Sequence, residues 1–264
     1  MEKKRAYNHI ITEEKDNYAI VRLNRPAVFN SFNRGMSFEL QDFLDYCSEN
    51  ERIRAIMLIG EGKAFCAGQD LGEVTDPEGP ALPDIVREHY NPIISRIRNL
   101  QIPVVAAVNG VAAGAGANIA LACDVVLASS AASFIQAFSK IGLIPDSGGT
   151  FFLPRLIGFQ KASALMMLGE KVSAEEAERM GMIFRCIPED QFAEATLKIV
   201  ETLSNMPTKG LWLTKKALNE SMCNGLDAQL ELEGKFQTEA GETDDYHEGV
   251  NAFLEKRRPE FKGR

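Results

Sequence analysis

Short apolar runs, each about the length of a strand, recur through the first half of the chain. They occupy residues 18–23, 53–60, 102–110, 124–129 and 132–138. Runs this short and this apolar are typical of strands that a sheet buries on both faces. Residues 8–12 form a further run, and the polar segment EEKDN between it and YAIVRL predicts two paired strands joined by a turn.

Helical spacing of apolar residues appears between these runs and is the only pattern at the end of the chain. Within 37–48 the periodic residues are Phe38, Leu40, Phe43, Leu44 and Cys47. Ser173 and Glu176 form an S-x-x-E capping box, which predicts a helix over 173–181. The other predicted helices cover 84–99, 112–123, 161–169, 191–205, 208–222, 226–241 and 244–257.

Strands that alternate with helices, followed by helices alone, predict an α/β fold. We therefore divide the chain into an α/β core over 1–190 and a helical region over 191–264. Within 226–241 the apolar residues form only a thin stripe of Leu226, Leu230, Leu232 and Phe236. Such a stripe cannot hold a helix in place by itself, so we expect it to pack on the core or on another subunit.

The composition is that of an ordinary globular protein and excludes several classes. Of the 264 residues, 45% are hydrophobic and 25% charged, and no run of eighteen apolar residues could cross a membrane. A net charge of −8 argues against a basic face that binds nucleic acid. The charged first ten residues lack the apolar stretch of a secretory signal. The five cysteines are scattered, without metal-site spacing, so we expect reduced thiols, no metal and a cytoplasmic location.

Two loops rich in glycine and alanine, FCAGQDL at 65–71 and NGVAAGAGAN at 109–118, each follow a buried strand. Small residues let a ligand approach the backbone, and a loop that enters a helix offers free N–H groups. Two such donors that converge would form an oxyanion hole. Each loop alone is equally well explained as a tight turn, and neither contains a phosphate-binding glycine pattern.

Several motifs follow one another along the chain in a characteristic order. They are LNRP (23–26), AFCAGQDL (64–71), AVNGVAAGAG (107–116), GLIPDSGGT with LPRLIG (142–158), SAEEAERMGMI (173–183) and EGVNAFLEKRRPEF (248–261). The series resembles the enoyl-CoA hydratase/isomerase superfamily, also called the crotonase family, over nearly the whole chain. The resemblance implies a crotonase-like spiral of ββα units with a C-terminal helical oligomerisation region. It also implies that the substrate arrives as a coenzyme A thioester and that no cofactor is permanently bound.

The resemblance further implies which residues form the site. In this family two backbone N–H groups hold the thioester oxygen, and here they belong to Gln69 and Ala115. Residues expected to contact coenzyme A are Arg25, Ala27, Val28, Ala64, Phe65, Ala67, Gly68, Asp70, Leu71 and Gly114, together with Phe253 and Lys256, which lie where family members reach a neighbouring subunit. The family forms trimers, often paired, so the resemblance implies a homotrimer or hexamer.

Hydratases of this family carry two glutamates that activate water, and this chain departs from the family at both positions. It has Asn118 and Phe138 there, and neither an amide nor a phenyl ring can take a proton from water. Asp146 occupies the position at which related isomerases place a working aspartate. It could instead be a solvated turn residue after proline. We expect an acid/base whose pKa is raised by an apolar wall such as Phe138 and Ile144.

The expected reaction is therefore isomerisation of an acyl-CoA. AFSKIGLIPDSGGT, FCAGQDL and YNPI resemble the part of the family that rearranges ring epoxides of phenylacetyl thioesters into oxepins, and a 3-enoyl to 2-enoyl shift is the other form. Three alternatives stay open: hydration, a dehalogenase-like attack by Asp146 on an aromatic ring, and coenzyme A binding without catalysis. Asn118 and Phe138 disfavour the first, the lack of a well-placed histidine disfavours the second, and Asp146 itself disfavours the third.

Overall fold

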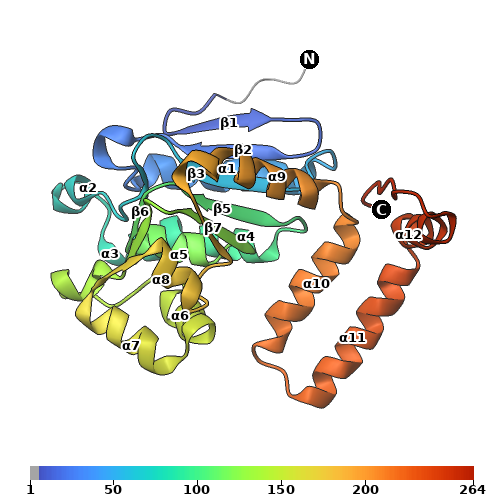
Figure 1. Ribbon diagram of the computed structural model, residues 1–264. Coiled ribbons are helices and arrows are strands. Elements are labelled where there is room, and N and C mark those ends of the chain that lie inside the picture. The colour runs from blue at the N-terminus through green and yellow to red at the C-terminus, as the bar shows by residue number, and fades with distance from the viewer. Residues whose placement is uncertain (1–5) are drawn as a thin grey trace.

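Two β-sheets form the centre of the molecule in the computed structural model, which describes residues 6–264 and leaves residues 1–5 of the charged start outside the description. The larger sheet has the order β1-β2-β3-β5-β7-β10 and the smaller β4-β6-β8-β9 (Figure 1). The larger one comprises β1 (Ile10–Glu14), β2 (Ala19–Leu23), β3 (Ile56–Gly60), β5 (Val104–Val108), β7 (Val125–Ser129) and β10 (Arg185–Ile187). The smaller one comprises β4 (Ala64–Cys66), β6 (Val111–Ala113), β8 (Ser133–Ile135) and β9 (Lys171–Ser173).

Successive strands alternate between the two sheets. The chain runs from β3 to β4, from β5 to β6 and from β7 to β8, and after each pair it turns into helical structure. Pairing is parallel along this series, and antiparallel only between β1 and β2 and between β8 and β9. This repeat is the ββα spiral that the resemblance implies, so the expected fold is confirmed.

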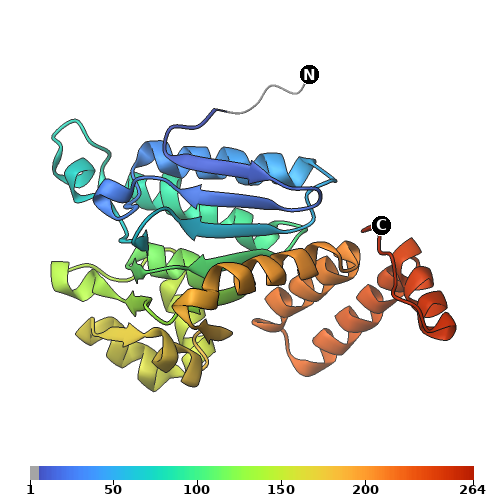
Figure 2. The same ribbon diagram turned by 45° about the horizontal axis from the view of Figure 1, so that its top comes forward.

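Helices cover both faces of the larger sheet, which explains its nearly continuous apolar strands. Along β5, Val104, Ala106 and Val108 join one core cluster while Val105 and Ala107 join another, because successive side chains point to opposite faces. The first cluster includes residues of α1 (Arg34–Glu49), α4 (Asn91–Asn99) and α5 (Ala115–Leu121). The second cluster is closed by α9 (Phe192–Ser204), which Figure 2 shows lying along the sheet.

Several short elements differ from the sequence prediction. The loop FCAGQDL contains the end of β4 and the first residue of α2 (Leu71–Thr75), and the run at 132–138 forms only β8 before a 3₁₀ turn, Ala137–Ile141. SGGTFFLPRLIG contains α6 (Gly149–Ile157), and β9 and β10 were also not predicted. Three-residue strands give too few positions for a period to show, and no helix was predicted over α6, which contains Pro154. The predicted helix 84–99 begins instead as a π-helical turn, Ile85–Tyr90.

The remaining helices are α3 (Leu82–Asp84), α7 (Phe159–Leu168), α8 (Ala174–Arg179), α10 (Thr208–Ser221), α11 (Leu226–Gly241) and α12 (Asp244–Glu255). Ser173 caps α8 by accepting a hydrogen bond from the Glu176 N–H, as its capping box predicts. The pair α10–α11 and the following α12 project beside the core (Figure 1). The division at residue 190 stays a prediction, and α9 beyond it packs on the sheet. No helix in the described residues is long and apolar enough to cross a bilayer.

Candidate active site

The two glycine-rich loops lie side by side because they leave neighbouring parallel strands. Ala64 of β4 pairs with Val111 of β6, and Cys66 pairs with Ala112. Gly68 has a φ of 97°, and a Cβ on it would lie 3.0 Å from the carbonyl oxygen of Ala113 and 3.7 Å from the amide nitrogen of Ala115. A side chain at position 68 would therefore separate the loops, and glycine lets their backbones meet.

The N–H groups predicted as oxyanion donors are both free for a ligand. Within residues 6–264, neither Gln69 nor Ala115 donates its backbone N–H to a protein acceptor. Ala115 is the first residue of α5, and Gly114 before it has a φ of 52° and accepts from the Asn118 N–H. Two unpaired donors on adjoining loops are the arrangement that stabilises negative charge on a carbonyl oxygen.

Backbone hydrogen bonds connect the first loop to the turn that follows β2. The N–H of Phe32 donates to the Gly68 carbonyl at 2.7 Å, and the Asp70 N–H donates to the Phe32 carbonyl at 2.8 Å. The Ala67 N–H donates to Phe29 at 3.0 Å. Asn30 is fully buried and joins the turn to β4, because its amide donates to the carbonyls of Glu61 and Ala64.

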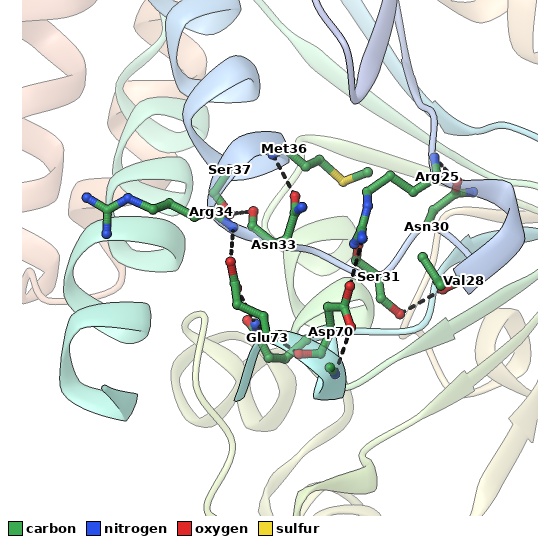
Figure 3. Close-up of polar contacts among 12 residues, drawn as sticks. Arg25, Val28, Asn30, Ser31, Asn33, Arg34, Met36, Ser37, Asp70 and Glu73 are labelled. Atoms are coloured by element: carbon green, nitrogen blue, oxygen red, sulfur yellow. Dashed lines mark hydrogen bonds and ion pairs between the residues drawn. The ribbon is translucent and has the colours of Figure 1, made fainter. Parts of the chain in front are cut away.

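Arg25 and Asp70 form an ion pair that adds a further link between this turn and the first loop. Figure 3 shows the guanidinium facing the carboxylate, with an Nη2–Oδ2 distance of 2.7 Å, and Arg25 also donates to the Ser31 carbonyl. Burial by itself would raise the pKa of Asp70, but Arg25 and the Gly72 N–H outweigh it and lower that pKa. The two residues therefore brace the loop, and their contact with coenzyme A stays a prediction.

The side chain of Gln69 is fixed at both ends. Its Oε1 accepts from the Tyr90 hydroxyl at 2.6 Å, and its Nε2 donates to Glu73 at 2.9 Å. Glu73 also accepts from the Arg34 N–H at 2.8 Å, the contact at the start of α1 in Figure 3. The sequence reasoning overlooked Glu73, although its position four residues after Gln69 was a signal that the two side chains could meet.

Asp146 follows the 3₁₀ turn and is half-buried. Its Oδ1 accepts from the hydroxyl of Ser147, a buried residue with a left-handed φ of 51°. Its backbone carbonyl accepts from the Asn118 side chain at 2.9 Å and from the Gly149 N–H at 2.8 Å. Burial raises the pKa of Asp146, and the Ser147 hydroxyl offsets this only in part.

Of the two residues expected to form an apolar wall around Asp146, only Phe138 is buried. Phe138 is buried, and its ring carbons lie 3.7 and 3.8 Å from where a Cβ on Gly114 would be, beside the second N–H donor. Ile144 is 81% exposed, so including it in the wall was wrong. Its place in the turn before Pro145 keeps it outside the packed core.

The other predicted contact residues divide into two groups. Ala64, Phe65 and Gly68 are buried and Ala67 is half-buried in the first loop, whereas Ala27, Val28 and Leu71 are exposed at its rim. Phe253 and Lys256 lie at the end of α12, on the opposite side of the molecule from α2 (Figure 1). One chain therefore does not bring them to the loops, and their contact across subunits stays a prediction.

Other reactive groups near the loops are poorly suited to chemistry. Burial raises the pKa of Cys66 to about 12, so its thiol stays neutral and is a weak nucleophile. Among the residues that the structure describes, no three His, Cys, Asp or Glu side chains gather where a metal could bind. Asp146 is linked to the helix of the second N–H donor, because Asn118 of α5 donates to its backbone carbonyl.

Comparison with known proteins agrees with this geometry. The family described as enoyl-CoA hydratase/isomerase matches residues 13–264. The chain belongs to the enoyl-CoA hydratase/isomerase family. An Escherichia coli K12 protein of this kind, 1,2-epoxyphenylacetyl-CoA isomerase, is 45% identical over 97% of this chain and 98% of its own. A Rhodobacter capsulatus protein named probable enoyl-CoA hydratase is also 45% identical, over 98% of this chain and all of its own.

A solved structure extends the agreement to the whole fold. Enoyl-CoA hydratase from Bacillus anthracis superposes with a TM-score of 0.90 at 32% identity, over 97% of this chain and 100% of that one. The enoyl-CoA hydratase/isomerase family implies an acyl-CoA substrate, and relatives of both reaction types match this chain over nearly its full length. The protein is thus an enzyme of the isomerase or hydratase type.

Proposed function

We propose that the protein is an acyl-CoA isomerase in which Asp146 moves a proton and the N–H groups of Gln69 and Ala115 hold the thioester oxygen. The observation that carries this proposal has two parts. A half-buried carboxylate with a raised pKa lies on a loop that Asn118 bonds to the helix beginning at Ala115, and the N–H donors of Gln69 and Ala115 have no protein acceptor within residues 6–264. Asn118 and Phe138 occupy the positions at which the family resemblance expects hydratase glutamates. The site therefore favours proton transfer over activation of water.

The proposed chemistry begins with the α-carbon of the acyl chain. The Asp146 carboxylate takes the α-proton, and the C–H electrons form a C=C bond while the carbonyl electrons move onto the thioester oxygen. The two N–H groups stabilise that negative charge, and losing one such donor costs about 3 kcal/mol of barrier. Asp146, now protonated, returns the proton at the γ-carbon of a 3-enoyl chain, which gives the 2-enoyl isomer.

A raised pKa suits both halves of this cycle. A general acid/base works best when its pKa approaches the working pH, because it must both accept and release the proton. Burial raises the pKa of Asp146 in that direction. Ring-epoxide isomerisation is the form that we favour, because a relative named 1,2-epoxyphenylacetyl-CoA isomerase is 45% identical.

Hydration is the second candidate, because a relative named probable enoyl-CoA hydratase is equally similar. In that reaction Asp146 would have to direct water without a second carboxylate, since the side chain of Asn118 is occupied by Asp146 and Gln136. A dehalogenase-like attack receives no such support. We further expect a homotrimer or hexamer in the cytoplasm.

The decisive experiment compares the natural chain with Asp146→Asn on a 3-enoyl-CoA and on a 2-enoyl-CoA, with both products followed by chromatography. Asp146→Asn should lower isomerisation about 1000-fold, as expected for the loss of a general acid/base. Affinity for the CoA thioester, measured by calorimetry, should stay within about twofold. Efficient water addition to the 2-enoyl-CoA by the natural chain would instead favour the hydratase, and an active Asp146→Asn would exclude Asp146 as the base.

A further inference from the structure

The side chain of Asn118 connects two parts of the proposed site. Asn118 lies on α5, three residues after Ala115, and is fully buried. Its Nδ2 donates to the backbone carbonyl of Asp146 at 2.9 Å. The helix that presents one N–H donor is therefore bonded directly to the loop that carries the carboxylate.

The Asp146 carbonyl and a second amide hold Asn118 in one orientation. A carbonyl can only accept, so the NH2 group of Asn118 must face Asp146 and its oxygen must face away. Gln136, which precedes the 3₁₀ turn, donates from Nε2 to that oxygen, Oδ1, at 2.8 Å. Gly149 leaves the space required, since a Cβ on it would lie 2.4 Å from Nδ2 of Asn118. The two amides thus form a directed relay from Gln136 through Asn118 to Asp146.

We infer that Asn118 is a positioning residue, which with Gln136 sets the distance between the Asp146 carboxylate and the N–H donor of Ala115. The inference rests on the proposed function, because it assigns Asn118 a role only through Asp146. Position 118 therefore has a structural role of its own, beyond the absence of the glutamate that hydratases carry there. An amide at this position keeps the loop in place without adding a second acid.

The relay matters because the loop that carries Asp146 needs support from outside to hold its position. The backbone after Asp146 passes through two left-handed residues, Ser147 and Gly148, before α6 begins, so the loop gains little support from regular secondary structure. A displacement of about 1 Å of a reacting group can lower a rate about 100-fold. Such a displacement should reduce turnover, whereas binding of coenzyme A, expected at the first loop, should remain.

The test measures kcat, KM and the incorporation of deuterium from D2O at the α-carbon in Asn118→Ala, Asn118→Asp and Gln136→Met. Asn118→Ala should lower kcat and exchange about 10- to 100-fold, with KM within about twofold. Asn118→Asp keeps the volume and still accepts from Gln136, but in its ionised form it cannot donate to Asp146, so it should lose as much. Its negative charge should also move the acidic limb of the kcat profile to higher pH, because a like charge raises the pKa of Asp146.

Gln136→Met should lower kcat only about 3- to 10-fold, because Asn118 then keeps its bond to Asp146 but loses the partner that orients it. This variant should fold well, since Oε1 of Gln136 is buried with no hydrogen-bond partner within the described residues. Adding it to Asn118→Ala should cause no further loss, because both act through one chain of contacts.

The matched control is Leu121→Ala, a buried position on the same helix that lies outside the relay. It should melt earlier than the natural chain and keep its kcat. A kcat within twofold of the natural chain in Asn118→Ala and Asn118→Asp, with Asp146→Asn inactive, would overturn the inference alone. Equal losses of kcat in Leu121→Ala would also overturn it, whereas an active Asp146→Asn would overturn the proposed function itself.

Discussion

Burial of a single carboxyl group couples activity to stability at Asp146. The folded protein raises the pKa of Asp146 above its ordinary value of 3.8, so the folded state holds the proton more tightly than the unfolded chain does. The stabilisation from this group is complete below about pH 3.8 and is lost as the pH rises through the raised pKa. Above the raised pKa the folded protein carries an ionised carboxylate that it solvates poorly.

Asp146→Asn should consequently make the protein more stable at pH 7, although it removes activity. The amide can still accept from Ser147, and it has no charge to desolvate. Its melting temperature should exceed that of the natural chain at pH 7, and the difference should shrink as the pH approaches about 4. Thermal melts across this range provide the measurement. A variant that is less stable at pH 7 would show that burial does not dominate the energetics of Asp146.

Individual site residues were predictable from sequence only through motifs. FCAGQDL and NGVAAGAGAN indicated two donor loops, and the family resemblance singled out Gln69 and Ala115 within them. The bond from Asn118 to Asp146 joins residues 28 positions apart, and no local pattern predicts a contact of that kind. Asn30 holds β4 through a side-chain bond to the Ala64 carbonyl, 34 positions away, which no local pattern predicts either, whereas Glu73 lies only four residues from its partner Gln69.

Among the secondary-structure elements, the apolar pattern predicted the long helices and the strands with continuous apolar runs. The strands β2, β3, β5 and β7 and the helices α1 and α9 to α12 lie where the periodicity placed them, because buried faces leave a clear signal. The smaller sheet was largely overlooked because its strands have three residues each. Its strands β4 and β6 lead into the donor loops, so the part of the fold that builds the site gives the weakest pattern.

A buried ammonium group is one of the contacts that attach α10 to the core. Lys215 is 6% exposed and donates to the carbonyls of Ile97 and Ile102 and to Asp124, which also pairs with Arg98. Burial lowers the pKa of Lys215, and Asp124 counters this effect. Removing one partner from such a buried cluster leaves the other groups unpaired, and this is strongly destabilising.

Lys215→Met should therefore lower the free energy of unfolding by about 3 kcal/mol. Lys216→Met is the control on the same helix, because Lys216 is exposed and its interactions, with the Phe236 ring and the charge of Glu239, lie outside the buried cluster. The control should change stability by about 1 kcal/mol or less. Urea denaturation measures both, and equal effects of the two variants would show that the buried cluster contributes nothing particular.

For the whole molecule, the C-terminal helices leave apolar surface that one chain does not cover. Leu226 is 74% and Leu254 71% exposed, and only Phe236 of the predicted stripe is fully buried. An apolar groove of about 430 Å³ lies between α10 and α12, with Val250 and Phe253 among its lining residues. Exposed apolar surface of this kind is typical of a contact with another protein. We predict that further copies of the chain cover it.

Assembly and coenzyme A binding should then be lost together. Phe253 and Lys256 lie far from the donor loops of their own chain, so the predicted contact with coenzyme A requires a neighbouring subunit (Figure 1). The natural chain, 29.1 kDa as a single copy, should have three or six times that mass in light scattering.

The double variant Leu230→Glu with Leu254→Glu should shift the mass towards that of a single copy, because carboxylates are costly to bury. It should also weaken CoA affinity. Ile11→Glu, at an exposed site on the edge strand β1, should change neither. If the double variant became a single chain with undiminished affinity, coenzyme A would be bound within one subunit and α12 would contribute nothing to the site.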